Sequence, residues 1–379
     1  MADIPKRADE PETGLAPDRD TRPAGPLRKG WTTGACAAAA ARAAVEGFLT
    51  GSFPDPVEIV LPRGQRPRFA LAQRARGEGW AAAGIIKDAG DDPDVTHGAL
   101  VVSTVAPGVP ESGITFRAGE GVGTVTRAGL LLPPGEPAIN PGPRAMITRA
   151  VHDAIDHCGG PSDYVVTVAI PGGAALAEKT LNARLGIVGG LSILGTTGIV
   201  VPYSCAAWIH SIHRGIDVAR AAGLTHVAAA TGSTSEAAVK QMYRLADMAL
   251  IDMGDFAGGT LKYLRDHPVP RFTIAGGFGK LAKLAAGHLD LHSSRTQADI
   301  AELVRVLVDL GASDAAIARA QGASSAGEVL QAAEVTGAAL AGAIAARARE
   351  VALATLAGGI AVDVAVFDRA GRLIGHAEP

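Results

Sequence analysis

The chain has 379 residues, of which 47% are hydrophobic, a composition that excludes a wholly disordered or fibrous protein. Its 35 basic and 38 acidic residues give a formal net charge of −3, and only 4% of the residues are aromatic. The lack of a basic excess and of stacking side chains argues against a nucleic-acid partner. Three cysteines, far apart in the sequence, fit a reducing compartment and not a disulfide framework.

The chain begins with a polar segment, residues 1–26, that is rich in Pro, Asp, Glu and Arg; we expect a disordered leader and no secretory signal. Residues 186–209 carry no Asp, Glu, Lys or Arg and are long enough to cross a bilayer. The same segment contains five glycines and Pro202, which would leave backbone groups unpaired in lipid. We therefore predict a buried Gly-rich loop and strand, and no membrane partner.

Residues 27–198 are expected to form a mixed, β-rich N-terminal domain with two helices, over Cys36–Leu49 and Pro143–His157. Tyr164–Ile170 has the β-branched composition of a buried strand. Gly and Pro separate six further strand-like runs, namely Val57–Leu61, Phe69–Gln73, Trp80–Lys87, Ala99–Val105, Ile114–Arg117 and Val122–Thr126.

Residues 199–379 alternate between strand and helix, which predicts βαβ units and a parallel sheet. Helices are expected at Ser204–Ala222, Ser235–Ala246, Phe256–Asp266 and Phe278–Ala286, and strands at Thr225–Ala230, Met248–Ile251 and Arg271–Ala275. Ala-rich helices follow, and Ala361–Phe367 forms a last strand that turns into a hairpin with Leu373–His376. The predicted fold class is α/β (α+β): a mixed β-rich N-terminal domain and a Rossmann-like parallel-sheet domain. The sequence leaves open whether the last strand intertwines the two.

A strand-to-helix turn, Thr231-Gly232-Ser233-Thr234-Ser235-Glu236, is the clearest chemical signal. A glycine there lets a ligand approach the backbone, and the N–H groups of a helix start can meet a polar or negative atom. Asp252 ends the next strand about 20 residues later, the separation at which an acidic residue accepts ribose hydroxyls. The pattern favours an adenosine-containing cofactor; the alternative is an ordinary turn in which Asp252 caps a helix.

The choice of cofactor depends on the glycines. Only one glycine of G-x-G-x-x-G is present, which weakens NAD and FAD, whereas S-adenosylmethionine (SAM) keeps the adenosine without a pyrophosphate. A second turn, at Gly276 and Gly277, follows the next strand, and adjacent turns of this kind share one crevice. Leu281 stands where a phosphate loop needs Ser or Thr, so we expect no ATP hydrolysis. Lys280 either meets an anion in the crevice or is a solvated lysine.

Several long motifs resemble the CbiD family of cobalamin biosynthesis, over about residues 27–293. They are Leu27-Arg-Lys-Gly30-Trp-Thr-Thr-Gly34-Ala-Cys36, Ile86-Lys-Asp88-Ala-Gly-Asp91-Asp92-Pro-Asp94-Val-Thr-His-Gly98, Gly121-Val-Gly-Thr-Val-Thr126, Gly135-Glu-Pro-Ala-Ile-Asn-Pro141 and Leu181-Asn-Ala-Arg184-Leu-Gly-Ile-Val-Gly-Gly-Leu-Ser-Ile-Leu-Gly195. The resemblance implies SAM-dependent methylation of C1 of cobalt-precorrin-5B to give cobalt-precorrin-6A, in the cytoplasm, by a two-domain α/β protein. The turns at Gly232 and Gly276 depart from the pattern of many relatives.

The expected SAM contacts combine the two turns with the glycine-rich loop, which we expect to line the same crevice. They are Thr231, Gly232, Ser233, Thr234, Glu236, Asp252, Gly276 and Gly277, with Gly189, Gly190, Gly195, Thr196 and Thr197 of the loop. The substrate implied by the resemblance, a cobalt corrinoid, carries several carboxylates, which arginine and lysine suit. The candidates in or beside the matching motifs are Lys29, Arg144 and Arg184, joined by Lys280.

Two further groups are candidates for substrate binding. Thr32, Thr33 and Gly34 open a helix whose N–H groups suit a propionate, with plain helix capping as the alternative. Asp88 and Asp94 belong to an acidic cluster for which metal binding, acid–base assistance and a charged turn all fit. We expect no protein metal site, because no Cys-x-x-Cys or matched pair of ligands is present. No strong general base is demanded, because a conjugated ring can supply the electrons for methyl transfer, and the sequence does not identify a base.

Two other functions stay open at this point. A non-catalytic carrier of corrinoid intermediates would need no SAM, and an NAD-dependent reductase is disfavoured by the missing glycines. Transient contact with neighbouring pathway enzymes is the one protein partnership expected, and the sequence gives no oligomeric state.

Overall fold

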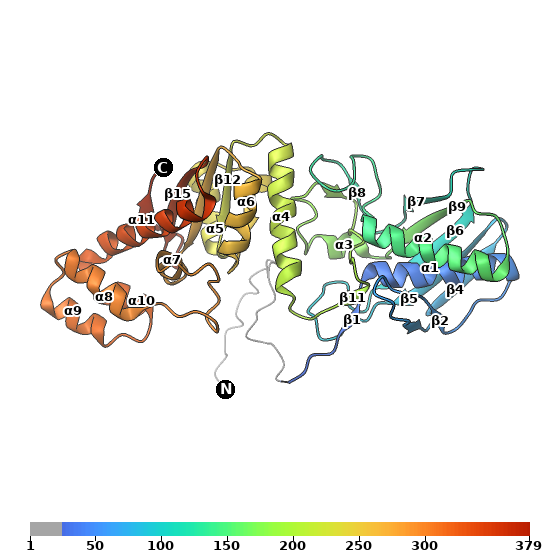
Figure 1. Ribbon diagram of the computed structural model, residues 1–379, viewed down its shortest axis with the longest axis horizontal. Helices are drawn as coiled ribbons and strands as arrows, with labels where there is room; N and C mark the ends of the chain where they lie inside the picture. The colour runs from blue at the N-terminus through green and yellow to red at the C-terminus, as the bar shows by residue number, and fades with distance from the viewer. Residues whose placement is uncertain (1–24) are drawn as a thin grey trace, which may run out of the picture. The chain divides into compact units, whose positions relative to one another are not determined.

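The computed structural model describes residues 25–379, which divide into two compact units (Figure 1). Unit 1 comprises residues up to Arg127 together with Leu131–Ser204, and unit 2 comprises Ala128–Leu130 and Cys205–Pro379. The predicted leader, residues 1–26, lies outside the described residues except for its last two.

Unit 1 is built on a five-stranded sheet in which neighbouring strands run antiparallel, apart from the parallel pair β9 and β7. In spatial order its strands are β4 (Gln73–Gly77), β5 (Trp80–Ile86), β6 (Leu100–Pro107), β9 (Tyr164–Ala169) and β7 (Ile114–Ala118). Three short antiparallel pairs accompany it: β1 (Gly30–Trp31) with β11 (Ile199–Val200), β2 (Val57–Glu58) with β3 (Arg68–Phe69), and β8 (Thr124–Val125) with β10 (Ile187–Val188).

Two long helices form the core of unit 1 with this sheet. Helix α1 (Thr33–Thr50) packs on β5 and β6, and α2 (Pro141–Cys158) lies beside α1 (Figure 1). The alanine run of α1 is buried, and small side chains let the helix approach the sheet closely. Thr32 caps α1, because its Oγ1 accepts the N–H of Ala35 at 3.2 Å. A short helix, α3 (Gly173–Ala177), follows β9.

Unit 2 contains the predicted parallel sheet. In spatial order its strands are β13 (Leu250–Asp252), β12 (His226–Ala230), β14 (Arg271–Gly277), β15 (Ala361–Phe367) and β16 (Leu373–Ala377). The first four are parallel, and β16 returns antiparallel to β15 as a hairpin. Because β15 pairs with β14, the last strands belong to the sheet of unit 2, and the intertwining that the sequence left open does not occur through them.

The helices of unit 2 cover the two faces of its sheet unequally. Helix α5 (Ser233–Tyr243) packs on one face. The other face is covered by α4 (Cys205–Ala221), α6 (Ala257–Asp266), α7 (Phe278–Ala285) and α11 (Gly337–Leu356), with α8 (Ile300–Asp309), α9 (Asp314–Gln321) and α10 (Ala326–Ala332) packed around them. Alternate β12 residues point to each face: Val227 and Ala229 join the larger core, Ala228 and Ala230 the smaller one.

Residues 186–209 do not form a continuous span; they contain β10, β11, bends and the start of α4. Over residues 25–379, no single helix is both long and apolar enough to cross a membrane. The bent pair Ala326–Ala332 and Glu334–Leu356, with 114° between its parts, passes that test by length and composition alone.

Candidate functional site

Three turns meet at the carboxyl edge of the unit 2 sheet. From the central strand β12 the chain passes through α5 to β13 on one side, and from β13 through α6 to β14 on the other. The register aligns Ala230 with both Asp252 and Ala275, so β12 and β13 end at the same level and β14 continues for two residues to Gly277. In open α/β sheets, ligands bind outside the strand ends at such a reversal of strand order. We call this place the switch point.

Gly232 is the exposed residue at the centre of the switch point. Its φ of 173° is an extended conformation that any residue adopts, and a Cβ added there would meet no atom within 4 Å. Neither the backbone nor the packing of unit 2 therefore explains the glycine, whereas room for a ligand against the backbone does. At Gly276 the reason is packing, since an added Cβ would lie 2.8 Å from Thr231 Oγ1.

Asp252 is held next to that turn by its neighbours. The N–H groups of Met253 and Gly254 both donate to the Ala230 carbonyl, at 3.0 and 3.1 Å. The Asp252 carbonyl accepts a hydrogen bond from Trp208 Nε1 at 3.1 Å. The structure thus brings Asp252, Thr231 and the glycines of two turns to one edge of the sheet.

Lys280 has partners that the sequence did not predict. Its Nζ donates to the Thr231 carbonyl at 2.6 Å and lies 3.1 Å from Asp255 Oδ1. The lysine is thus half-buried and has two internal partners, and its contact with an anion in the crevice stays a prediction. It connects the first turn of α7 to the turns that follow β12 and β13.

In unit 1, the start of α1 is bonded to the glycine-rich loop. The N–H of Thr32 donates to the Gly198 carbonyl at 3.0 Å, and the N–H of Gly34 donates to the Leu194 carbonyl at 3.1 Å. A Cβ on Gly195 would lie 2.4 Å from Thr32, so packing explains that glycine. These two N–H groups already have acceptors, which favours the capping alternative for Thr32 over a propionate site.

The loop contains both packed and exposed members. A Cβ on Gly190 would lie 2.3 Å from the Gly121 carbonyl carbon, whereas Gly189 and Thr196 are exposed. Thr197 is half-buried, and its Oγ1 accepts the N–H of Ile199 at 3.2 Å. Gly189, Gly190, Gly195, Thr196 and Thr197 all belong to unit 1, and the turns at Gly232 and Gly276 belong to unit 2.

The acidic cluster of unit 1 is a charged turn with internal partners. Asp88 forms a bidentate ion pair with Arg28, which together with the Gly90 N–H lowers the pKa of Asp88 to about 2. Asp94 forms an ion pair with the buried Lys87. These bonds account for Asp88 and Asp94 without a metal or a proton-transfer role, and in residues 25–379 no three His, Cys, Asp or Glu side chains are grouped to hold a metal ion.

The basic candidates differ in their surroundings. Arg144 is held inside unit 1, because its Nε donates to the Ile139 carbonyl at 2.7 Å and its guanidinium pairs with Glu136 at 2.8 Å. Lys29 is exposed beside β1, and Arg184 is half-buried before the glycine-rich loop. Among the candidates for binding substrate carboxylates, the structure therefore leaves Lys29 most accessible.

A buried polar network lies near the opposite, amino-terminal edge of the unit 2 sheet, and the sequence analysis missed it. Asp363 on β15 is fully buried and accepts hydrogen bonds from Tyr243 Oη at 2.6 Å, Thr273 Oγ1 at 2.9 Å and Arg271 Nε at 3.1 Å. His376 Nε2 lies 3.0 Å from Tyr243 Oη. The available signal was a single acidic residue in the otherwise apolar run Ala361–Phe367, since a buried carboxylate needs partners.

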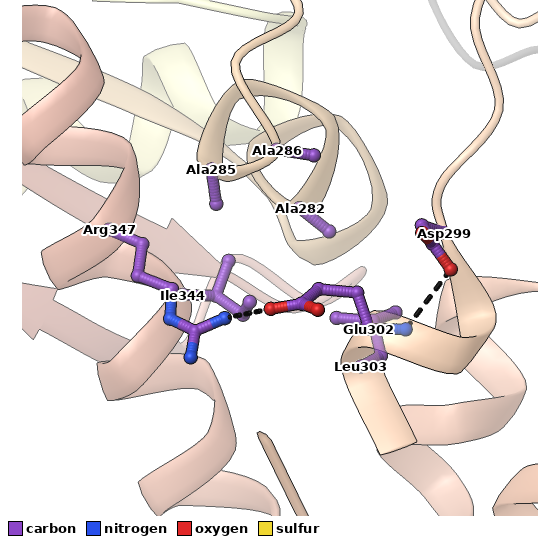
Figure 2. A pocket seen from close by; sticks show the side chains of 8 residues that line it. All are labelled: Ala282, Ala285, Ala286, Asp299, Glu302, Leu303, Ile344 and Arg347. Atoms are coloured by element: carbon purple, nitrogen blue, oxygen red, sulfur yellow. Dashed lines mark hydrogen bonds and ion pairs between the residues drawn. The ribbon is translucent and has the colours of Figure 1, made fainter. Parts of the chain in front are cut away.

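A pocket of about 310 Å³ lies between α7, α8 and α11 (Figure 2). Ala282, Ala285 and Ala286 point into it from α7, on the side of that helix opposite Lys280. Its charged side chains already have partners in unit 2. Glu302 pairs with Arg347 at 2.6 Å, and Asp299 caps α8. The pocket has no polar group directed at a ligand.

Comparison with known proteins identifies the relatives of this chain. Residues 20–202 match the CbiD family, and residues 290–378 match the C-terminal domain of CbiD. The chain is 57% identical to a cobalt-precorrin-5B C(1)-methyltransferase of Brucella anthropi over 95% of this chain and 98% of the relative. It is 61% identical to one from Bradyrhizobium sp., over 93% and 94%. A crystal structure of the cobalamin biosynthesis protein CbiD from Archaeoglobus fulgidus is 27% identical, with a TM-score of 0.39 over 76% of this chain and 93% of that one.

Proposed function

Because the chain belongs to the CbiD family, it methylates C1 of cobalt-precorrin-5B in cobalamin biosynthesis with SAM as the methyl donor, and we propose that it binds this donor at the switch point of unit 2. The observation that carries the proposal is Gly232, a glycine with open space beside it at the reversal of strand order.

The proposed donor contacts come from three turns. Asp252 accepts the ribose hydroxyls, and the exposed start of α5, Gly232 to Thr234, supplies backbone and hydroxyl groups. Gly277 adds room, since a Cβ there would also meet no atom within 4 Å. SAM supplies a methyl group on a positively charged sulfur.

The contribution of the protein to the reaction is positioning. Holding two reactants in line can contribute about 7–11 kcal/mol to a barrier. Charge on the donor is lost during the transfer, so a site closed to water also favours it. The macrocycle supplies the electron pair, and we assign no general base to the chain.

The substrate contacts are proposed for unit 1. Lys29, exposed beside the start of α1, and Arg184 bind carboxylates of the macrocycle. Gly189 and Thr196, which the sequence assigned to SAM, are reassigned to the substrate, because this loop belongs to unit 1 and its two residues are exposed. We also propose that the protein is cytoplasmic and that it exchanges intermediates transiently with neighbouring enzymes of the pathway.

The test is incubation of the purified protein with methyl-labelled SAM and a tetrapyrrole pool arrested just before this step. We expect mass spectrometry to find one added methyl in the macrocycle, dependent on the protein. A non-catalytic carrier would bind the macrocycle but not SAM, and its product would carry no label. That result would exclude the proposed donor site.

A further inference from the structure

Lys280 links the three turns of the switch point, because it lies after β14 and its Nζ contacts the turns after β12 and β13. Its Nζ bonds to the Thr231 carbonyl after β12 and lies 3.1 Å from Asp255 after β13, and the lysine itself follows β14. Thr231 is further fixed by its own N–H, which donates to the Ala275 carbonyl at 2.9 Å. The lysine therefore fixes the relative positions of the turns that the donor contacts.

Asp255 forms an ion pair with this lysine, and Lys283 and Arg295 also interact with its charge. Its Oδ1 is buried and receives no hydrogen bond of good geometry from residues 25–379, so the ion pair with Lys280 is its close contact. The next lysine on the same face of α7, Lys283, donates instead to the Leu291 carbonyl at 2.9 Å. The Leu291 N–H in turn donates to the Asp255 carbonyl at 2.9 Å, which anchors the backbone of the aspartate.

The bond to Thr231 has a directional consequence. In a trans peptide the carbonyl and the following N–H point in opposite directions. By holding the Thr231 carbonyl, Lys280 fixes the plane of the Thr231–Gly232 peptide and with it the direction of the Gly232 N–H. The glycine turn thereby presents its donor in one orientation, although its exposed side has no packing to hold it.

We propose that Lys280 and Asp255 form a positioning pair for the methyl donor: the lysine orients the Gly232 turn, and the aspartate offsets the charge of the lysine, so that a cationic ligand meets less positive charge there. This inference rests on the proposed donor site. It replaces a substrate-binding role for Lys280, because its ammonium is already committed to two internal acceptors.

The experiment measures the Kd of SAM and of S-adenosylhomocysteine, the uncharged product of methyl loss, by calorimetry. The variants are Lys280→Met, Lys280→Arg, Asp255→Asn and the double variant Lys280→Met/Asp255→Asn, with Lys262→Met on the exposed side of α6 as control. We expect Lys280→Met to raise the Kd of S-adenosylhomocysteine about 10-fold. Lys280→Arg should keep a Kd close to that of the wild type, because arginine can still donate to the Thr231 carbonyl. The Kd of the corrinoid should stay at its wild-type value in both, and Lys262→Met should change nothing. Lys280→Met should lower the Tm, because the buried Asp255 loses its paired cation.

The charge of the ligand provides the second readout. Asp255→Asn removes the negative charge paired with Lys280. The Kd of SAM should therefore rise by a factor at least about three times larger than the rise for S-adenosylhomocysteine. In the double variant the ratio of the two Kd values should return to that of the wild type, because both charges are gone. A merely structural role would weaken both ligands equally in Asp255→Asn, and that result would overturn the proposal.

Other outcomes separate the two proposals. If Lys280→Met raises the Kd of the corrinoid and leaves both adenosyl ligands unaffected, the lysine binds substrate and the positioning pair is wrong. If Asp252→Ala weakens SAM but no variant of the pair does, the donor site stands and the pair fails. If neither Asp252→Ala nor the pair affects SAM, the donor site itself is misplaced.

Discussion

Asp252 and Gly232 lie side by side at the switch point, but their substitutions should have different consequences. Removal of the Asp252 carboxylate deletes the proposed acceptor for the ribose hydroxyls, and its backbone bond to Trp208 remains. Hydrogen bonds to a charged group contribute about 1.5–3 kcal/mol. We expect Asp252→Ala to raise the Kd of SAM about 10- to 100-fold with corrinoid binding retained, as measured by calorimetry. Equal affinity of wild type and variant for SAM would contradict the assignment.

Gly232 offers a test in which binding and stability respond in opposite directions. Its extended backbone accepts alanine, and reduced freedom of the unfolded chain should leave the protein as stable or more stable by about 0.4–1 kcal/mol. The added methyl would occupy the space that the donor needs, so SAM binding should fall about 10-fold or more. Gly342→Ala on α11, where an added Cβ also meets no atom within 4 Å, is the matched control and should leave SAM binding unchanged.

At the level of residues, local sequence predicted what depends on a single turn. The apolar run of β12 followed by Gly232 indicated a strand-to-helix turn, which the structure has, and Asp252 ends the next strand as predicted; the ligand site itself stays a prediction. The role of Lys280 was out of reach, because its acceptor Thr231 is 49 residues away and Asp255 is on a third turn. The acidic cluster looked reactive in sequence, but the ion pair of Asp88 with Arg28, 60 residues away, gives it a structural explanation.

Among the elements, β15 carries Asp363, a fully buried carboxylate of unit 2. Burial works against the Asp363 carboxylate, but hydrogen bonds from Arg271, Tyr243 and Thr273 hold its pKa below the ordinary value. Removing one partner of a buried pair typically costs about 3–5 kcal/mol, because the other charge is left uncompensated. We expect Asp363→Ala to destabilise unit 2 by that amount in urea unfolding, with SAM contacts at the other edge of the sheet unaffected in the folded protein.

A smaller loss for Asp363→Asn than for Asp363→Ala should follow, since the amide oxygen still accepts from Thr273 and Tyr243. If Asp363→Ala unfolds at the wild-type urea concentration, the network contributes no net stability. That result would leave its burial without an energetic explanation.

The neighbouring His226, at the start of β12, makes stability depend on pH. Burial, aided by Arg271, lowers its pKa below the ordinary 6.5, and its Nε2 lies 2.7 Å from Thr273 Oγ1. The unfolded chain therefore takes up this proton at a higher pH than the folded protein, so stability is lost as the pH falls below about 6.5. His226→Gln should reduce the difference in unfolding free energy between pH 7.5 and pH 5.5.

His213 on α4 has a pKa lowered by burial in the same way, so His226→Gln should flatten the pH dependence without abolishing it. The double variant His226→Gln/His213→Gln should flatten it further. If the unfolding free energy of His226→Gln changes with pH as steeply as that of the wild type, His226 does not contribute to the pH dependence.

The pattern of apolar and polar residues predicted most helices and strands, because that pattern is local in the sequence. Ala361–Phe367 is β15 as predicted, and Gly and Pro marked most boundaries correctly. Helix α2 begins two residues earlier than predicted, at Pro141, because proline is accommodated in the first turn of a helix. The predicted strand Val57–Leu61 shortens to Val57–Glu58, since Leu61 donates instead to the Gln65 carbonyl in a turn. Strand order was not predictable, because pairing joins distant segments.

At the scale of the whole molecule, the same sheet holds the proposed donor site at its carboxyl edge and a stabilising network near its amino edge. Parallel strands place these on opposite sides of one scaffold, so each can be altered without touching the other. The labelled-methyl experiment should therefore succeed with any variant at the amino edge that still folds. Asp252→Ala and Gly232→Ala should reduce label transfer without lowering the unfolding midpoint.

The pairing of β15 with β14 determines when the sheet of unit 2 can be completed during synthesis. A ribosome makes β14 more than eighty residues before β15, and until Ala361–Phe367 emerge the growing chain has β14 as an open edge of hydrogen-bonding groups. During that interval the nascent protein is exposed to aggregation and is a natural client for a chaperone. The donor site, whose three turns are all translated by then, acquires its rigid support only when the last strands arrive.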